Sequence, residues 1–419
     1  MTGYLKHLSD KRFLVILLLG FSSGLPLALT GSTLQAWYTT AGVDLVTIGA
    51  LTLVGQPYVY KFIWAPLLDR FAFFNMDRRR SWILLMQLGL VVSLVAIAYS
   101  NPTFYPGWMA FLAFIVATFS ATQDIAIDAY RTDLLDKPDY GLASSLNGIG
   151  YRAAMILSGA IALILAGQIG WRNTYLIMAA LLLAEMCVTL WAPRPMALLS
   201  PPTLKEAVVE PFRDFMKRPC PIILLIFIVI YKLTDSFGLS LTTPFLIRGL
   251  GFSLTEIGTI AKSVSIIASI VGTLAGGLLF APLGLFRSLW YFGILQALAN
   301  LAFMCLALAG KSYVLMAVAL FADNFCSAMG SVAFVAFLMT LCNKEFTATQ
   351  FALFSALSAV GRVFVGPVAA IVVDQMGWPL FYVAAMALGA PALFLLWFLR
   401  KRLPVFNKSG APTGTGKMI

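Results

Sequence analysis

The chain has few charged residues for its length. Only 11% of its 419 residues are Asp, Glu, Lys or Arg, whereas a soluble globular protein carries about 25%. Hydrophobic residues make up 60% of the chain, and the mean hydropathy is +0.89. This composition excludes a soluble cytosolic enzyme, a disordered chain and a secreted disulfide scaffold, and it indicates a membrane protein.

Residues that carry soluble-enzyme chemistry are also scarce. The one histidine, His7, lies in the N-terminal tail, and the five cysteines are widely spaced without a CxxC pair. No P-loop or dinucleotide-binding glycine motif follows a strand pattern. We therefore predict no catalytic residues, no metal site and no cofactor. We expect a protein that is not an enzyme and that draws on an ion gradient, with any coupled proton carried by carboxylates.

Twelve apolar runs are each long enough to cross a bilayer, which takes about 20 residues. The first run follows Lys11 and Arg12 directly and is too long for a removed signal peptide, so we expect it to remain as the first span. This pattern predicts an all-α membrane protein with twelve transmembrane helices. The predicted spans are residues 13–39, 45–67, 82–99, 108–130, 141–167, 174–192, 221–247, 255–279, 288–308, 312–341, 347–373 and 379–399.

The basic residues assign the two sides of the membrane. With the N terminus inside, 21 of the 29 Lys and Arg residues fall in inner segments, three fall in outer segments and five lie within spans. Positive residues concentrate in cytoplasmic loops, so both termini are predicted to be cytoplasmic. The same distribution accounts for the net charge of +11 without a nucleic-acid partner, because the positive charges form no single stripe.

The spans divide into two halves of six. We predict an N-terminal half (residues 1–192), a cytoplasmic linker (193–220), a C-terminal half (221–402) and a disordered tail (403–419). Internal repetition supports the division. Residues 41–49 and 250–258 are identical at four of nine positions, and residues 146–150 echo residues 357–361 at nearly the same offset.

Two parallel six-helix repeats joined by a long inner loop resemble the major facilitator superfamily, whose substrate site lies near the midplane between the halves. The loop between spans two and three adds to this resemblance. Its sequence PLLDR at residues 66–70, followed by three arginines at residues 78–80, is similar to the superfamily's acidic and basic gating motif, although it has inserted residues and lacks the central glycine. Asp69 and Arg70 are therefore gating candidates. The alternative is that these arginines only hold the loop inside.

The fourth predicted span carries charges at a depth where they are costly. Asp124, Asp128 and Arg131 are spaced to lie on one face of a helix. Two carboxylates one turn apart repel each other in a low dielectric, which favours binding of a proton to one of them. We predict proton coupling at Asp124 and Asp128. In the alternative, Asp128 pairs with Arg131 and leaves Asp124 as the proton site.

Other charges lie deep in other predicted spans. In the seventh span Lys232 and Asp235 are three residues apart, and the tenth span contains Asp323. We predict Asp235 and Asp323 as further proton-coupling groups, unless Lys232 and Asp235 form a static pair. The cations predicted to bind an anionic substrate group are Arg152, Lys232 and Arg362, with a weaker case for Lys61. Alternatively, the arginines pair with buried aspartates.

Aromatic and amide side chains near these charges are candidates for contacts with a sugar. Trp37, Tyr151 and Tyr231 are suited to stacking on a sugar face, and Gln35 and Gln123 to binding hydroxyl or amide groups. Such aromatic residues more often pack in a core or anchor a helix at the interface. Single glutamines in spans more often make hydrogen bonds between helices.

Five stretches resemble the AmpG muropeptide permeases of Gram-negative bacteria, and the resemblance extends over essentially all twelve spans. They are residues 20–30 (GFSSGLPLALT), 33–37 (TLQAW), 123–130 (QDIAIDAY), 245–249 (FLIRG) and 341–352 (LCNKEFTATQFA).

This resemblance implies a multi-pass inner-membrane protein that imports N-acetylglucosaminyl-anhydromuramic acid, with or without its peptide, from periplasm to cytoplasm. The expected partners are this small-molecule substrate, protons and the lipid bilayer. One alternative is a carrier of another anion such as acetyl-CoA, to which the family resemblance also extends. Another is a membrane sensor that transports nothing.

Overall fold

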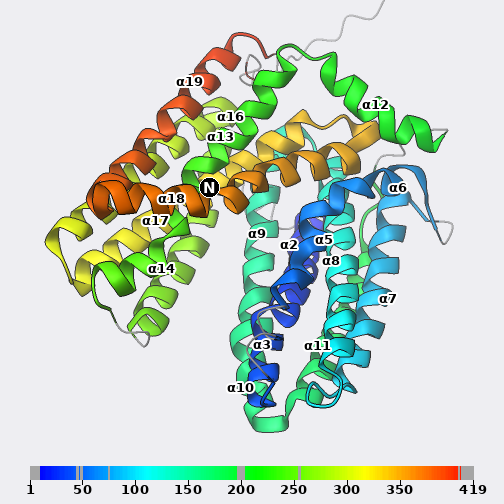
Figure 1. The fold of residues 1–419 in the computed structure, drawn as a ribbon. Helices are drawn as coiled ribbons and strands as arrows, with labels where there is room; N and C mark the ends of the chain where they lie inside the picture. The colour runs from blue at the N-terminus through cyan, green and yellow to red at the C-terminus, as the bar shows by residue number, and fades with distance from the viewer. Residues whose placement is uncertain are drawn as a thin grey trace, which may run out of the picture. The chain divides into compact units, whose positions relative to one another are not determined.

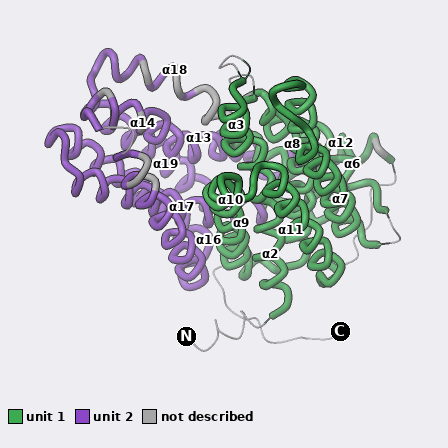
Figure 2. The backbone as a smooth tube through the Cα atoms, turned by 90° about the horizontal axis from the view of Figure 1, so that it is seen from below, with its two compact units in different colours: residues 1–214, 341–359 green, residues 215–340, 360–419 purple. Residues whose placement is uncertain are grey.

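The structure is a computed structural model that describes residues 10–43, 47, 51–73, 76–195, 203–252, 256–403 and 406. The side chains of a few residues within these ranges, including Arg362, lie outside the description. The described residues form helices and no strands, which confirms the predicted all-α class. Two compact units are present (Figure 2). Unit 1 comprises residues 1–214 and 341–359, and unit 2 comprises residues 215–340 and 360–419.

Unit 1 contains the long helices of the first half of the chain (Figure 1). The first span is divided between two helices at Gly31, and short helical turns occupy most of the second. The elements are α2 (Lys11–Thr30), α3 (Ser32–Thr40), η1 (Leu51–Gly55), α5 (Gln56–Tyr60), η2 (Lys61–Ile63), α6 (Ala65–Arg70), α7 (Arg78–Ala98), α8 (Pro106–Leu134), η3 (Lys137–Asp139), α9 (Tyr140–Ile156), η4 (Leu157–Ile161), α10 (Ala162–Ile169), α11 (Trp171–Trp191) and α12 (Leu204–Met216), whose last two residues belong to unit 2.

Unit 2 contains most of the second half. Its elements are α13 (Pro221–Ser240), α14 (Thr242–Pro244), η5 (Phe245–Gly249), η6 (Ile257–Ala261), α16 (Lys262–Ala309), α17 (Tyr313–Leu341) and α19 (Gly389–Arg400). Helix α18 (Thr347–Ala387) belongs to unit 1 as far as Ala359 and to unit 2 from Val360. The short helix η7 (Lys344–Phe346) precedes α18 and lies in unit 1. The boundaries predicted for the two halves and the linker stay predictions.

Local signals in the sequence account for several helix ends. Asp10 and Asp77 cap α2 and α7 by accepting hydrogen bonds from backbone N–H groups in the first turn. Pro106 and Pro221 begin α8 and α13, where the missing N–H costs nothing. Gly284, with a φ of 71°, interrupts the helical backbone inside α16, so α16 consists of two helices joined by a kink that separates the eighth and ninth predicted spans.

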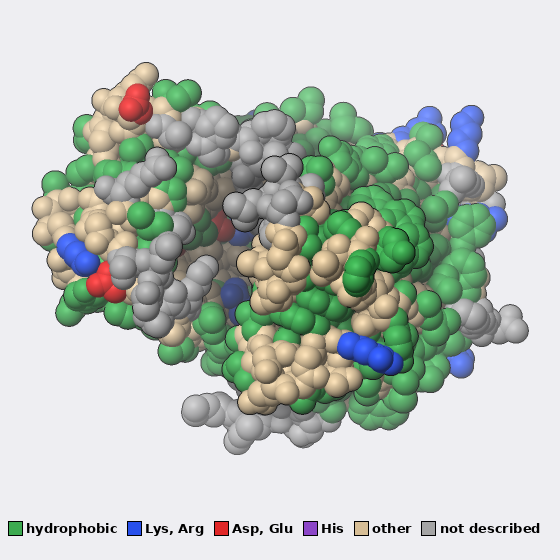
Figure 3. Space-filling view, turned by 60° about the horizontal axis from the view of Figure 1, so that its bottom comes forward, with side chains coloured by type: hydrophobic (Ala, Val, Ile, Leu, Met, Phe, Trp, Pro, Cys, Tyr) green, Lys and Arg blue, Asp and Glu red, His purple; other side chains and the backbone are tan. Residues whose placement is uncertain are grey.

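The described residues contain nine stretches that are long and apolar enough to cross a membrane. One of them, Ser263–Ala309, covers two predicted spans, and shorter helices lie in the range of the second span. The exact count of twelve spans stays a prediction. On the face shown in Figure 3, hydrophobic side chains cover much of the surface and charged side chains are isolated. Large hydrophobic side chains are also exposed along the long helices, such as Val92 on α7 and Val314 on α17, as expected where helices face lipid.

Close helix packing organises unit 1. Helices α2 and α9 lie so near each other that a Cβ added at Gly24 would meet the backbone oxygen of Tyr151, and one added at Gly150 would meet that of Leu17. Small residues at such crossings let helix backbones approach in a membrane. This packing fixes the position of the α9 residue Arg152, directly beside Tyr151.

Candidate functional site

Asp124 lies on α8 and faces α2. Its carboxylate accepts a hydrogen bond from the hydroxyl of Ser23, a contact that the sequence alone did not indicate. Lys61, which is 9% exposed, exerts a favourable Coulomb interaction on Asp124. Asp124 makes no ion pair within the described part of the chain. It is thus a carboxylate inside a spanning helix that is free to exchange a proton without breaking a salt bridge.

Asp128, one turn further along α8, has a cation bound to it. Arg131 Nη2 donates to Asp128 Oδ1 at 2.8 Å, and the exposed fractions of the two side chains are 3% and 20%. The geometry therefore matches the alternative in which Asp128 pairs with Arg131. Protonation of Asp128 would leave a buried guanidinium without its counter-ion, which is costly. The predicted proton-coupling role of Asp128 remains untested, and its surroundings favour it less than those of Asp124.

Gln123 lies in a polar layer between helices. Gln123 Nε2 donates to Ser22 Oγ at 2.8 Å, and Gln87 Nε2 donates to the same oxygen at 3.1 Å. Thr189 Oγ1 in turn donates to Gln87 Oε1 at 2.9 Å. This layer joins α2, α7, α8 and α11, so the contacts of Gln123 are those of an interhelical hydrogen-bonding residue.

Trp37 and Gln35 differ in their surroundings. Trp37 is 8% exposed and its ring stacks on Trp171 at 5.6 Å. A second ring contact with Tyr175, at 5.2 Å, places Trp37 in the apolar core of unit 1. Gln35 is partly buried on α3. Of the two predicted binding residues, Gln35 therefore keeps the more accessible side chain.

Arg152 is a partly buried cation on α9. No residue in the described ranges forms a hydrogen bond or ion pair with it, and the phenol of the neighbouring Tyr151 interacts with it electrostatically. Tyr151 is also partly buried. The side chain of the pseudo-equivalent Arg362 lies outside the described residues. Arg152 thus leaves a guanidinium available for a carboxylate ligand.

In unit 2, α13 carries a salt-bridged cluster. Lys232 Nζ lies 2.7 Å from Asp235 Oδ2 and donates to Ser331 Oγ at 2.9 Å. The other oxygen of Asp235 accepts from Ser327 Oγ at 2.7 Å. This is the static pair that the sequence analysis left open as an alternative. Any ligand that binds Lys232 or proton that binds Asp235 must compete with these contacts.

Asp323 and Tyr231 occupy different positions in the same unit. Asp323, on α17, is 5% exposed, and its Oδ2 has no hydrogen-bond partner among the described residues. Tyr231 is 4% exposed, stacks on Phe334 at 5.4 Å and donates to the Leu289 backbone oxygen at 3.1 Å. Tyr231 therefore packs in the core, whereas Asp323 is a buried carboxyl group with unused bonding capacity.

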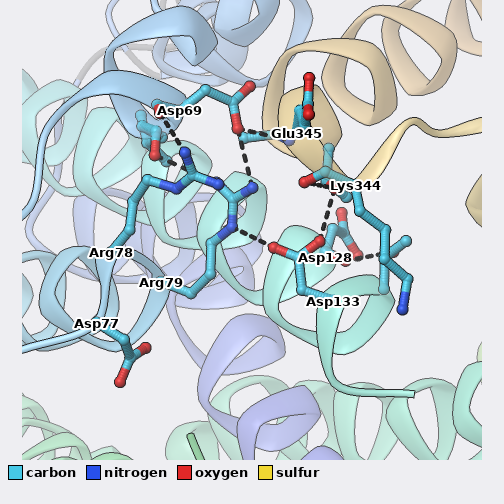
Figure 4. Close-up of polar contacts among 12 residues, drawn as sticks. Asp69, Asp77, Arg78, Arg79, Asp128, Asp133, Lys344 and Glu345 are labelled. Carbon is cyan, nitrogen blue, oxygen red and sulfur yellow. Dashed lines mark hydrogen bonds and ion pairs between the residues drawn. The ribbon is translucent and has the colours of Figure 1, made fainter. Parts of the chain in front are cut away.

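A second polar cluster in unit 1 joins helix ends that the predicted topology places on the cytoplasmic side (Figure 4). Arg79 lies between two carboxylates, with Nη2 2.9 Å from Asp69 Oδ1 and Nε 2.7 Å from Asp133 Oδ2. All three side chains are at most 2% exposed. Asp69, predicted as a gating residue, is thus paired with Arg79 and not with its neighbour Arg70, whose guanidinium lies over the ring of Phe71.

The two carboxylates also hold the start of α18. Asp69 accepts from the backbone N–H groups of Ala348 at 3.3 Å and Thr349 at 2.8 Å, and from Thr349 Oγ1 at 2.6 Å. Asp133 accepts from Thr347 Oγ1 at 2.6 Å. Carboxylates are favourable at a helix N-terminus because the first N–H groups lack partners inside the helix. We call Asp69, Arg79, Asp133 and the first turn of α18 the inner cluster.

Sequence analysis missed most of the inner cluster. Asp133 and Thr347 were not singled out, and Arg79 appeared only as one of three adjacent arginines. Its partner Asp133 is 54 residues away in the chain, and no local spacing connects the two. The one signal available was the resemblance to the gating motif, which identified Asp69.

Glu185 on α11 is a further carboxyl group within a predicted span, the sixth. It is 8% exposed, and its Oε2 has no partner among the described residues. Its backbone oxygen accepts from Thr189 Oγ1 at 3.3 Å. These contacts assign it no function.

Apolar spanning helices with buried charges in each unit define a multi-pass membrane transporter. Residues 13–365 match the model of the Major Facilitator Superfamily. The chain is 48% identical over 402 residues to the anhydromuropeptide permease of Escherichia coli K12, covering 96% of this chain and 82% of that relative. The chain therefore belongs to the major facilitator superfamily and, within it, to the AmpG-type permeases, as the sequence resemblance predicted.

Solved structures support the same fold. The proton:xylose symporter XylE, bound to 6-bromo-6-deoxy-D-glucose, matches with a TM-score of 0.69 over 93% of this chain and 95% of its own, at 13% identity. The human organic anion transporter TETRAN matches with a TM-score of 0.70 over 92% of this chain and 99% of its own, at 16% identity. At these identities the likeness concerns the fold alone.

Proposed function

We propose that the chain imports anhydromuropeptides, the disaccharide N-acetylglucosaminyl-anhydromuramic acid with or without its peptide, from the periplasm into the cytoplasm together with protons. The observation that carries this proposal is the 48% identity to the anhydromuropeptide permease of Escherichia coli over 96% of this chain. The protein then acts as a carrier in the bacterial inner membrane and not as an enzyme, with both termini in the cytoplasm.

Asp124 is the leading candidate for the coupled proton. It lies in a spanning helix, has a hydroxyl donor in Ser23 and has no salt bridge among the described residues. A carboxylate held by a salt bridge must lose that bridge before it binds a proton, which makes Asp128 and Asp235 weaker candidates. Asp323, buried with an unpartnered oxygen, is a second candidate, in unit 2.

Arg152 is the leading candidate for binding the substrate. The peptide of an anhydromuropeptide carries carboxylates, and a guanidinium binds a carboxylate with two parallel hydrogen bonds. Arg152 is partly buried and has no partner within the described part of the chain. The amide of Gln35 is suited to sugar hydroxyls. Lys232 can also bind a substrate carboxylate if that carboxylate replaces Asp235 as its partner.

The inner cluster is proposed as a gate. Helix α18 continues from unit 1 into unit 2 at Val360, and the inner cluster holds its first turn within unit 1. Release of Asp69 and Asp133 from this turn would free it. This assigns gating to Asp69, as predicted, with Arg79 in place of Arg70 as the residue that positions it.

Uptake into proteoliposomes tests the proposed function. Purified protein is reconstituted and supplied with radiolabelled disaccharide or disaccharide-peptide, with an inward proton gradient, without a gradient, or with a protonophore. We expect accumulation of both ligands with the gradient, and equilibration alone without it. Accumulation of acetyl-CoA but of neither muropeptide would establish the other anion carrier. If no solute accumulates while the protein remains folded, the transport proposal is wrong.

A further inference from the structure

A cavity at one end of unit 2 lies outside the clusters described above. Its volume is about 260 Å³, and α16 and α19, which pack against each other (Figure 1), provide its walls. The lining residues are Phe286, Arg287, Trp290, Tyr291, Trp397 and Arg400. The cavity thus combines two guanidinium groups with four aromatic rings.

The two arginines lack counter-ions within the described part of the chain. Arg287 and Arg400 are exposed, and no Asp or Glu in the described ranges pairs with either. The Arg400 guanidinium lies 4.9 Å from the ring centre of Phe286, which itself stacks on Trp290 at 5.9 Å. The stack holds Arg400 against the cavity wall without neutralising its charge.

The position along the helices places the cavity at the inner surface of the membrane. Arg287 follows the bend at Gly284 in a predicted inner loop, and Arg400 ends α19, followed by Lys401 and Arg402. At the rim, Tyr291 and Trp397 are each 49% exposed. Tyrosine and tryptophan are enriched where the bilayer meets water, and their rings lie at the level of the lipid headgroups.

We propose that this cavity binds the headgroup phosphate of an anionic phospholipid of the inner leaflet. Arg287 and Arg400 contact the phosphate, and the exposed rings of Tyr291 and Trp397 cover the glycerol and the first acyl methylenes. Basic pockets between spanning helices on the cytoplasmic side are suited to such headgroups. A free phosphate ion would satisfy the arginines and leave the apolar rim unused, so the combination favours a lipid.

Native mass spectrometry of the full-length protein in detergent tests this site. Phosphatidylglycerol is titrated against phosphatidylcholine with the same acyl chains. The variants are Arg287→Gln, Arg400→Gln and the double substitution. The matched control is Arg172→Gln. Arg172 is also an arginine that stacks on an aromatic ring, with its guanidinium 4.2 Å from the ring centre of Tyr99, but it lies in the loop between the fifth and sixth predicted spans.

We expect the wild type to prefer phosphatidylglycerol. At about 1 kcal/mol for each basic residue near an anionic lipid, each single variant weakens that binding by about fivefold and the double variant by about 25-fold. The control keeps the wild-type affinity, and Arg400→Lys retains most of it because the charge remains. Thermal unfolding with and without phosphatidylglycerol verifies that every variant is folded and provides a second measure of binding.

Two results would overturn the proposal. If the double variant binds phosphatidylglycerol as tightly as the wild type, the lipid binds at another site or only non-specifically around the spanning helices. If glycerol 3-phosphate displaces the lipid at an affinity equal to that of the lipid itself, the site recognises a soluble phosphate and the apolar rim contributes nothing. Both measurements are independent of transport, so they also stand if the proposed substrate is wrong.

Discussion

Replacing Arg79 by glutamine should destabilise unit 1 severely. The guanidinium bridges Asp69 at 2.9 Å and Asp133 at 2.7 Å, and all three side chains are at most 2% exposed. Glutamine keeps some of the hydrogen bonds but removes the positive charge, so two carboxylates remain buried without a counter-ion. Breaking a buried ion pair from one side costs about 3 to 5 kcal/mol. At about 2 to 4 °C per kcal/mol for a unit of this size, the unfolding midpoint should fall by roughly 10 °C.

The assay is thermal unfolding of purified protein in detergent, with Arg78→Gln as the control. Arg78 is the neighbouring arginine, it is partly exposed, and it donates to the backbone oxygen of Asp69. The control should change stability by about 1 kcal/mol, the typical net contribution of one hydrogen bond, because that contact is with a backbone oxygen and not with a buried carboxylate. The comparison therefore separates loss of the buried bridge from loss of one positive charge in this loop.

A second readout reports on α18. Cys342 lies in the segment of residues 341–359 that packs in unit 1, and it is partly exposed. With the other four cysteines replaced, Arg79→Gln should accelerate its reaction with a maleimide, because the first turn of α18 loses the carboxylates that hold it. If Arg79→Gln melts within about 1 °C of Arg78→Gln and Cys342 reacts at the wild-type rate, the inner cluster does not anchor α18.

Three further predictions concern other positions. In proteoliposomes, Asp124→Asn should abolish gradient-driven accumulation while exchange without a gradient persists. Asp128→Asn should instead keep the dependence on the gradient. If the Asp124→Asn variant still accumulates substrate, Asp124 does not carry the coupled proton. Arg152→Gln should weaken binding of the disaccharide-peptide more than that of the bare disaccharide in a competition assay, and equal losses would indicate a structural residue. Gly150→Ala, whose Cβ would lie 2.0 Å from a backbone oxygen of α2, should cost about 1 to 3 kcal/mol in thermal unfolding, whereas Gly167→Ala, with nothing within 4 Å, should be neutral or stabilising.

The fold was predictable because the bilayer imposes strong local rules. A span must satisfy its backbone hydrogen bonds internally, so each long apolar run indicates a helix. The range of α17, Tyr313–Leu341, nearly coincides with the predicted span at residues 312–341. The breaks within spans were not predictable from hydropathy. Gly31 divides the first span, and short turns replace one long helix between Leu51 and Arg70, although neither change alters the apolar content.

The candidate site was predictable only in part. Charged residues are costly in a membrane span, and this cost indicated which residues are unusual. Their spacing of three residues along a helix indicated that Asp128 could pair with Arg131 and Lys232 with Asp235, and both pairs are present. Long-range partners could not be derived from one sequence. Thr349 and Asp69 are 280 residues apart, and the hydrogen bond between them depends on how α18 enters unit 1.

The two units share a pattern that bears on coupling. In each unit one partly buried aspartate of a predicted span is salt-bridged to a cation three residues away on the same helix, and another is not salt-bridged among the described residues: Asp124 in unit 1 and Asp323 in unit 2. A salt-bridged carboxylate binds a proton only by leaving its cation unpaired in a low dielectric, so of these four aspartates the two without a salt bridge are the more favourable for proton binding. Of these, Asp124 has both a hydroxyl donor and a nearby lysine that support its charged form, whereas Asp323 has an oxygen without a donor among the described residues. A coupling group must be stable in both forms during the cycle, and on that criterion the contacts favour Asp124. The comparison of Asp124→Asn with Asp128→Asn therefore tests whether a salt bridge prevents an aspartate from serving as the proton-coupling group. The two residues lie on one helix and differ mainly in whether a cation is bound.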